Sequence, residues 1–247
     1  GGGWSVYEGD HHGDIIWAKY GFDSDFRYYD VDASKWDINI YAKWQYQPSS
    51  YWSLFADVQY RRLQHRMNGF ADNPALFIQR KFDFINPKAG ITYTRNGWQA
   101  YLSYAAANKE PNRDDFEAGL TKQPRHEALH DFEGGIEKKA LKYHAAATLY
   151  YMLYKDQLVQ TGMINDVGAY TRMNVPDSYR AGLEIQGGYV FTDWLRATAN
   201  ATFSRNKIKR FTAAYDEYIG WDATGSQVTE ELRNTDISFS PAIIAAG

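Results

Sequence analysis

Cysteine is missing from all 247 residues of the sequence. Disulfide bonds, thiolate metal sites and cysteine nucleophiles are therefore excluded. The sequence also has no run of 18 apolar residues, so it contains no candidate transmembrane helix. Its net charge of -3 offers no basic footprint for nucleic acid, and we expect no nucleic-acid partner. A nucleophilic GxSxG motif and a phosphate-binding glycine loop are absent as well.

Aromatic residues are abundant, at 17% of the chain, and residues 35–67 place them in a regular pattern. Apolar and polar side chains alternate there with a period of two, which indicates strands with one apolar and one polar face. The apolar positions are Trp36, Ile38, Ile40, Ala42, Trp44 and Tyr46, then Trp52, Leu54, Ala56, Val58 and Tyr60. Gln47-Pro48-Ser49-Ser50 separates the two runs, which predicts one antiparallel hairpin. About ten alternating residues is the length that a tilted strand needs to cross a bilayer.

The same organisation recurs along the chain. Further strand pairs are expected at residues 88–94 and 98–106, 129–138 and 142–154, and 179–191 and 195–204, with single strands at 14–20 and 235–246. Asn96-Gly97 is a strong signal for a tight hairpin turn. Long loops are expected at 22–34, 64–86, 107–128, 155–177 and 206–233. Alternating short turns and long loops are typical of outer-membrane barrels, in which the short turns are periplasmic.

Two further patterns favour a membrane barrel. Aromatic residues gather beside the short turns, as in the girdle at a membrane interface: Trp44, Tyr46, Trp52, Tyr93, Trp98, Tyr189, Phe191 and Trp194. The polar faces carry mixed charge, which suits a wet or plugged lumen: Asp37, Lys43, Asp57, Gln59, Arg61, Glu133, Glu137, Arg180, Glu184, Arg196 and Asn200. We predict an all-β, antiparallel up-and-down transmembrane β-barrel, of which this chain supplies about ten strands.

Four stretches resemble the barrel of TonB-dependent receptors, in particular those of Bacteroidetes. They are GWSVYEGDHHGDIIWA (3–18), NPKAGITYTRNGWQAYLSYAAANKEPNRDDF (86–116), HEALHDFEGGIEKK (126–139) and YYMLYKDQLVQTGMINDVGAYTRMNVPDSYRAGLEI (150–185). In the third stretch Glu127, Phe132, Glu133 and Gly135 fit the family's pattern, whereas His126 stands where proline is usual.

The resemblance implies a 22-stranded outer-membrane barrel with an N-terminal plug and a TonB box. Such receptors import a scarce nutrient (a siderophore, cobalamin, haem or an oligomer) with energy delivered through TonB. We therefore expect residues 1–247 to form part of one such barrel domain in the cell outer membrane, in contact with its lipid. The implied partners are TonB and the nutrient, and no cofactor, metal or catalytic site is expected.

The 247 residues contain neither a plug nor a TonB box, and Ile243 to Gly247 does not match the terminal aromatic residue of the family. We therefore expect a central-to-late portion of the barrel. If the resemblance holds, ligand contacts come from extracellular loops, and the candidates are Tyr28, Tyr29, His65, Arg66, Arg113, Tyr170, Arg172, Tyr215, Tyr218 and Trp221.

Two other functions compete with transport. One is a soluble all-β carbohydrate-binding module that uses exposed aromatic residues. The other is a zinc metalloprotease, because residues 126–130 read HEALH and match the HExxH motif. That motif needs a helix to bring its histidines onto one face, whereas on a strand they lie roughly 13 Å apart.

Two acidic segments are weaker metal candidates. Residues 10–14 read DHHGD and could hold a transition metal. Calcium could bind Asp23, Asp25, Asp30 and Asp32, but the EF-hand pattern fails because Lys35 occupies its glycine position.

Overall fold

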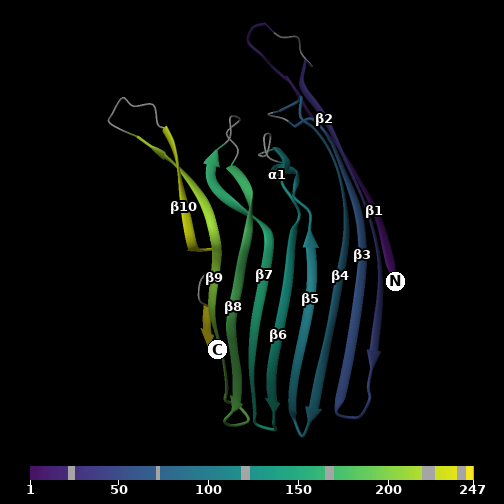
Figure 1. Cartoon of the computed structure of the whole chain (residues 1–247), viewed down its shortest axis with the longest axis vertical. Helices are drawn as coiled ribbons and strands as arrows, with labels where there is room; N and C mark the ends of the chain where they lie inside the picture. Colours follow the sequence, from purple (N-terminus) through teal and green to yellow (C-terminus); the bar gives the residue numbers. More distant parts are fainter. Residues whose placement is uncertain are drawn as a thin grey trace.

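The computed structural model describes residues 1–21, 26–70, 73–117, 123–164, 170–218, 226–237 and 243–246. These residues form one antiparallel sheet in which β1 to β10 each pair with the next strand along the chain (Figure 1). The strands are β1 (Gly2–Asp14), β2 (Arg27–Tyr46), β3 (Trp52–Asn68), β4 (Phe77–Arg95), β5 (Trp98–Lys109), β6 (Glu127–Lys139), β7 (Tyr143–Ile164), β8 (Tyr170–Val190), β9 (Arg196–Glu217), β10 (Ser226–Asp236) and β11 (Ile243–Ala246). The predicted all-β, up-and-down antiparallel architecture is confirmed.

One short helix, α1 (Arg113–Glu117), lies between β5 and β6. In the part of the chain that is described, no helix is long and apolar enough to span a membrane.

Short connections join β2 to β3, β4 to β5, β6 to β7 and β8 to β9 at one end of the sheet, which we call the turn end; the opposite end is the loop end (Figure 1). The predicted Asn-Gly turn is confirmed: Asn96 and Gly97 have φ angles of 51° and 76°, as in a type I′ turn. Glycine is needed there for a second reason, because a Cβ at Gly97 would collide with the carbonyl oxygen of Lys139.

At the loop end the strands extend well into the predicted loops. The predictions of continuous loops at 22–34, 64–86, 155–177 and 206–233 are wrong, because β2 begins at Arg27, β4 at Phe77 and β8 at Tyr170, while β7 continues to Ile164 and β9 to Glu217. The predicted loop at 107–128 is shortened by β5 and β6 and contains α1. The predicted strand at 14–20 is also wrong, since β1 covers Gly2–Asp14 and pairs with β2 from Ile40 to Arg27.

The register explains why these extensions escaped detection. Near the turn end, one face carries exposed apolar side chains, among them Ile40, Val58, Ile85, Leu102, Leu149 and Phe203. We call this the apolar face and the other the polar face. Farther along the strands, the positions that continue the apolar face become polar, as at Arg62, Gln64 and Arg66 of β3. The alternation disappears there although the hydrogen-bond ladder continues.

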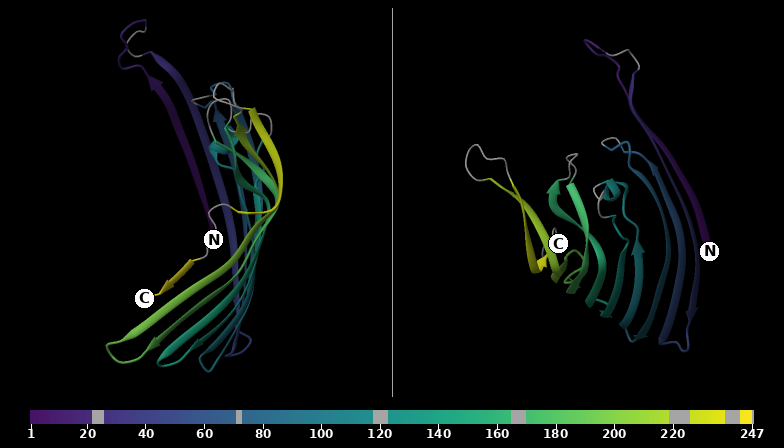
Figure 2. Two further views of the ribbon diagram at one scale, coloured as in Figure 1. Left: turned by 90° about the vertical axis from the view of Figure 1, so that its left-hand side faces the viewer. Right: turned by 45° about the horizontal axis from the view of Figure 1, so that its top comes forward.

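The predicted last strand at 235–246 is split. The end of β10 pairs with Lys207 of β9, and β11 pairs with β9 again from Thr202 to Ala199. The register is shifted by two residues when pairing resumes. The chain between β10 and β11 is therefore two residues longer than the segment of β9 that it passes. The sheet as a whole is curved along its strands (Figure 2).

The buried residues lie mainly toward the loop end. One cluster contains Met67, Phe70, Ile78 and Phe116, and a second contains Val175, Ile208 and Ile237. The polar face is therefore covered at that end, and the first cluster marks where a loop packs against it.

The two faces predict different responses to a new charge. Leu183 pairs with Leu149 and Phe203 on the apolar face, whereas Gln186 pairs with Ala146 and Asn200 on the polar face. We expect Leu183→Arg to lower the free energy of folding into lipid vesicles by about 2 kcal/mol, and Gln186→Arg to lower it by less than about 1 kcal/mol. Urea titration of vesicle-inserted protein measures both, and equal losses would contradict the assignment of the faces.

Candidate ligand site at the loop end of the polar face

The connection between β5 and β6, residues 110–126, folds back onto the polar face. Its described parts are residues 110–117, which include α1, and residues 123–126. The backbone N–H of Asn112 donates to Oδ2 of Asp115 at 2.7 Å, the reach-back half of a capping box. This contact starts the helix and turns the chain toward the sheet.

Four charged side chains tie the start of this connection to β2 and β3. Nζ of Lys35 donates to Oε1 of Glu110 at 2.7 Å, and Nη1 of Arg61 donates to Oε2 of Glu110 at 2.8 Å. Nε of Arg61 also donates to Oδ2 of Asp37 at 2.8 Å. We call Lys35, Asp37, Arg61 and Glu110 the charge network. Because each carboxylate faces a cation, the network holds its charges with little exposure to water.

The network keeps Glu110 ionised. Burial alone would raise the pKa of Glu110, but hydrogen bonds from Arg61 and Lys35 outweigh burial and lower the pKa to about 2. The carboxylate therefore stays charged, and the attachment stays intact, throughout the physiological pH range.

An apolar contact reinforces the attachment. Phe116 of α1 is fully buried against Met67, Phe70 and Ile78. Arg113 of α1 lies over the Phe70 ring at 4.5 Å and donates from Nη2 to the carbonyl oxygen of Gly69 at 3.1 Å. The helix is thus fixed to both β3 and the β3–β4 connection.

His65 lies beneath this helix and is 7% exposed. Its ring packs between Phe82 and Phe116, with centroid distances of 6.3 and 6.1 Å. Nε2 has no hydrogen-bond partner among the described residues. Burial, and next the positive charge of Lys35, lower the pKa of His65 to about 4, so this side chain is neutral at physiological pH.

The far side of the connection is held by β7 and β8. Asp115 accepts a hydrogen bond from Nη1 of Arg172 at 3.2 Å. Arg125 forms an ion pair with Asp156, and its backbone N–H donates to Oδ1 of Asn174 at 2.8 Å. The β5–β6 connection is therefore anchored on β2–β4 at one side and on β7–β8 at the other.

The HEALH segment does not form a zinc site. His126 precedes β6 and packs against Phe84 with a centroid distance of 5.3 Å, whereas His130 lies within β6 and contacts Tyr104, its Nδ1 2.8 Å from the hydroxyl oxygen. Tyr104 belongs to the apolar face, so the two histidines lie on opposite faces of the sheet. The metalloprotease alternative is excluded by this geometry.

The acidic segments are likewise engaged in the sheet. His11 and His12 lie within β1, and Asp14 accepts a hydrogen bond from Nε of Arg27 at 3.0 Å. Arg27 also donates to Asp30 at 2.8 Å. Asp23 and Asp25 lie outside the described residues. Elsewhere in the described chain, no group of three or more histidine or acidic side chains is arranged to hold a metal.

The ten candidate ligand residues are dispersed. His65, Arg113 and Arg172 meet around α1, but each contacts a neighbouring side chain of the chain itself. Arg66 is exposed on the opposite face from His65. In β2, Tyr28 is 61% exposed and Tyr29 is half-buried. Tyr170 is the first residue of β8, and Tyr215 and Tyr218 are exposed at and just beyond the end of β9. Trp221 lies outside the described residues. A role of any of them in ligand binding stays a prediction.

Sequence reasoning missed the residues that position this region. Glu110, Asp115 and Phe116 lie in a segment that showed no alternation. The spacing of Asn112 and Asp115 is a capping pattern and could have located α1. No sequence signal points from Glu110 to Lys35 or Arg61.

A polar hollow of about 440 Å³ lies on the polar face, nearer the turn end than the charge network. Lys43 and Asp57 line it with an ion pair of 3.5 Å, and Nδ2 of Asn86 donates to Oε1 of Gln59 at 3.0 Å. The polar face therefore changes along the strands, from an open hollow to the covered charge network.

Comparison with protein families identifies the family of this chain. A family model described as the β-barrel of TonB-dependent receptor-like proteins matches residues 2–236. The chain belongs to this family. Its members are transport receptors of the bacterial outer membrane rather than enzymes.

Solved structures of such receptors share the fold. The copper transporter OprC is 14% identical, over 78% of this chain and 35% of that one, with a TM-score of 0.66. The ferric-catecholate import receptor Fiu of Escherichia coli K12 is 15% identical, over 83% and 34%, with a TM-score of 0.58. The ferripyoverdine receptor of the outer membrane of Pseudomonas aeruginosa is 11% identical, over 94% and 37%, with a TM-score of 0.55. The chain spans about a third of the length of these receptors. No curated protein matches it.

Removing the carboxylate of Glu110 should loosen the connection. Glu110→Gln keeps the shape but leaves Lys35 without an anionic partner, and we expect the packing of residues 110–117 to weaken by about 2 kcal/mol. Amide hydrogen exchange of these residues measures the change. Glu137→Gln, at the turn end of the same face, is the matched control and should leave their exchange unaltered; similar exchange in both variants would contradict the role of the network.

Acid should weaken the same packing through His65. An exposed histidine has a pKa near 6.5, and the buried one about 4. Between these values the undocked connection binds more protons than the docked one. Docking is therefore fully favoured above about pH 6.5 and weakens as the pH falls toward about 4.

Hydrogen exchange of residues 110–117, corrected for the intrinsic rate at each pH, measures this dependence. His65→Phe should abolish it, because it removes the imidazole that takes up the proton, whereas the carboxylate of Glu110 keeps its charge in this range. The charged groups that face the ring are Lys35, Asp37, Arg61 and Glu110. A pH dependence that persists in His65→Phe would show that another group is responsible.

Proposed function

We propose that the chain forms part of the wall of an outer-membrane receptor that takes up a scarce nutrient with energy supplied through TonB. The observation that carries the proposal is the family match along nearly the whole chain, together with a sheet that has an exposed apolar face and a charged polar face. In a barrel these two faces meet lipid and lumen.

We place ligand recognition at the loop end of the polar face. The anchored β5–β6 connection makes this end a preorganised surface, which lowers the ordering cost of binding. His126 and Arg80 are exposed here: His126 packs on Phe84, and Arg80 lies opposite His65 in the register. Imidazole and guanidinium groups suit an anionic or metal-containing ligand.

Metal chelates are the first substrates to test. The proteins named above are a copper transporter, a ferric-catecholate import receptor and a ferripyoverdine receptor. Cobalamin, haem and oligomeric nutrients are the other candidates. A soluble carbohydrate-binding module is disfavoured, because a soluble domain would not expose the many large apolar side chains of this sheet.

Deleting the gene should abolish energy-dependent uptake of one such nutrient. Cells grown with a single limiting source of iron, copper or cobalamin are compared with the parent strain, with and without a protonophore, and the membrane fraction is probed for the protein. We expect the protein in the outer membrane and one growth defect that plasmid-borne wild type restores. Recovery of the protein in the soluble fraction would overturn the proposal.

A further inference from the structure

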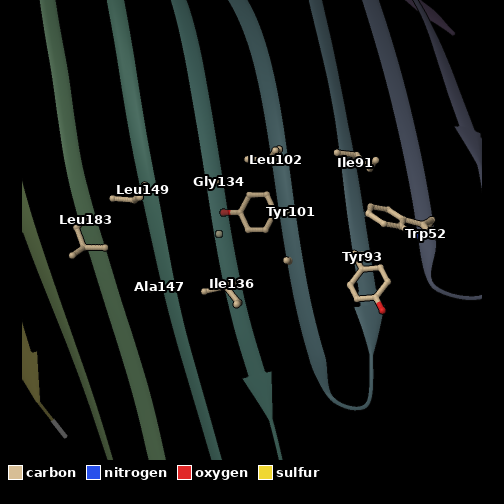
Figure 3. Close-up of a pocket in the computed structure, with 12 residues that line it drawn as sticks. Trp52, Ile91, Tyr93, Tyr101, Leu102, Gly134, Ile136, Ala147, Leu149 and Leu183 are labelled. Carbon is tan, nitrogen blue, oxygen red and sulfur yellow. The ribbon is translucent and has the colours of Figure 1, made fainter.

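The apolar face is hollowed near the turn end, between β3 and β8 (Figure 3). The hollow has a volume of about 610 Å³. Small residues line it at Ala100, Gly134 and Ala147, while the larger side chains of Leu102, Leu149 and Trp52 surround them (Figure 3). The surface is therefore indented where neighbouring strands carry alanine or glycine.

A second hollow of about 780 Å³ adjoins the first toward β2 and the loop end. Ile91 and Leu102 line both hollows and face each other across β4 and β5, so they form a ridge between them. Ala56 and Ala89 supply the small residues of the second hollow. We call the two hollows together the groove.

Two cations lie at the turn end of the groove, on the same face. Arg95 follows Tyr93 by two residues and Lys138 follows Ile136 by two, so each lies about 6.6 Å farther along its strand. Arg95 lies over the Tyr51 ring at 5.2 Å, and Nζ of Lys138 lies over the Trp98 ring at 5.0 Å.

No carboxylate among the described residues neutralises these two cations. Lys138 donates to the carbonyl oxygen of Asn96 at 2.7 Å, and neither Arg95 nor Lys138 forms an ion pair with any residue that the structure describes. Held in place by aromatic rings, they can receive a negatively charged group that arrives at this end of the groove.

We propose that the groove binds one phospholipid with an anionic headgroup from the periplasmic leaflet, with its acyl chains in the two hollows and its phosphate against Arg95 and Lys138. The inference rests on the proposed function, since it requires the apolar face to lie in the outer membrane, where short turns are periplasmic. A lipid fits this position because the groove is continuous with the face that meets hydrocarbon.

The charges account for selectivity. Surrounding lipid is as apolar as the groove, so burial of an acyl chain there provides no net hydrophobic gain and only the closeness of the fit favours it. A cation close to the membrane surface attracts an anionic lipid directly. The groove therefore positions the lipid, and Arg95 with Lys138 selects its headgroup.

Native mass spectrometry tests the proposal on the receptor expressed in its outer membrane and purified in detergent. Phosphatidylglycerol and phosphatidylethanolamine are the two probes. We expect wild type to retain phosphatidylglycerol preferentially, and the double variant Arg95→Gln/Lys138→Gln to bind it about 30-fold more weakly. The control Arg62→Gln/Lys81→Gln removes the same two charge types from the loop end of the same face and should stay within about twofold of wild type.

Filling the groove tests the fit separately. In Gly134→Leu the new Cβ approaches Cδ2 of Leu102 to 2.9 Å, the tip of a flexible side chain that can move aside. We expect about threefold weaker retention of both lipids, because the acyl chain loses its contacts. Ala147→Leu should weaken lipid retention to a similar extent. Gly187→Leu, on the same face but outside the groove, should leave the retention of both lipids unchanged.

The outcomes separate this proposal from the one on which it rests. If the receptor is found in the outer membrane and takes up its nutrient, but wild type and Arg95→Gln/Lys138→Gln retain the two lipids equally, the lipid site is overturned and the transport function stands. If native masses instead show a dimer that Gly134→Leu dissociates, the groove binds a second copy and the lipid proposal fails. If the protein is not in the membrane at all, the proposed function fails first.

Discussion

The structure depends on one constraint: hydrocarbon offers no hydrogen-bond partner, so every backbone N–H and C=O group in the membrane must be paired within the wall itself. The continuous antiparallel register from β1 to β10 pairs each of these strands with its neighbours in the sheet. It also decides which face each side chain meets, because alternate residues point in opposite directions along a paired strand. The charge network on one face and the groove on the other are both consequences of the same ladder. Once the register is set, neither can shift without flipping every side chain of a strand.

The charge network positions the β5–β6 connection rather than adding much to stability. Removing charges from water costs nearly as much free energy as their attraction returns, so a buried ion pair is weak evidence for stability. Its geometry, however, is demanding: Glu110 must meet Lys35 and Arg61 together. Phe116 supplies the apolar contact that makes the fold-back favourable, and His65 must remain neutral beneath it. The loop end thus combines a specific attachment with a modest net free energy, which suits the ligand surface proposed there.

The period of two was informative only near the turn end, where one face of the sheet is apolar and the other is polar. There the hairpin at 35–67 and the Asn96-Gly97 turn were predicted correctly. Toward the loop end, polar residues such as Arg62 and Arg66 replace the outward apolar ones, so the sequence resembles a loop although the strands continue. For the candidate site, residue type alone singled out His65, Arg113 and Arg172. The structure brings them together around α1, but it adds Glu110, Asp115 and Phe116, which pattern analysis did not select.

The sequence by itself determined the fold class, the positions of the short turns and the face of each residue near the turn end, because alternation and turn chemistry are local properties of the chain. Only the tertiary structure decided which residues meet across strands. Lys35, Arg61 and Glu110 are far apart in the sequence, as are Arg95 and Lys138, and their proximity results from the register of several successive strands and from one loop that folds back. A register shift of one residue would leave the composition of every strand unchanged while separating these groups, which is the physical reason that local patterns cannot specify them.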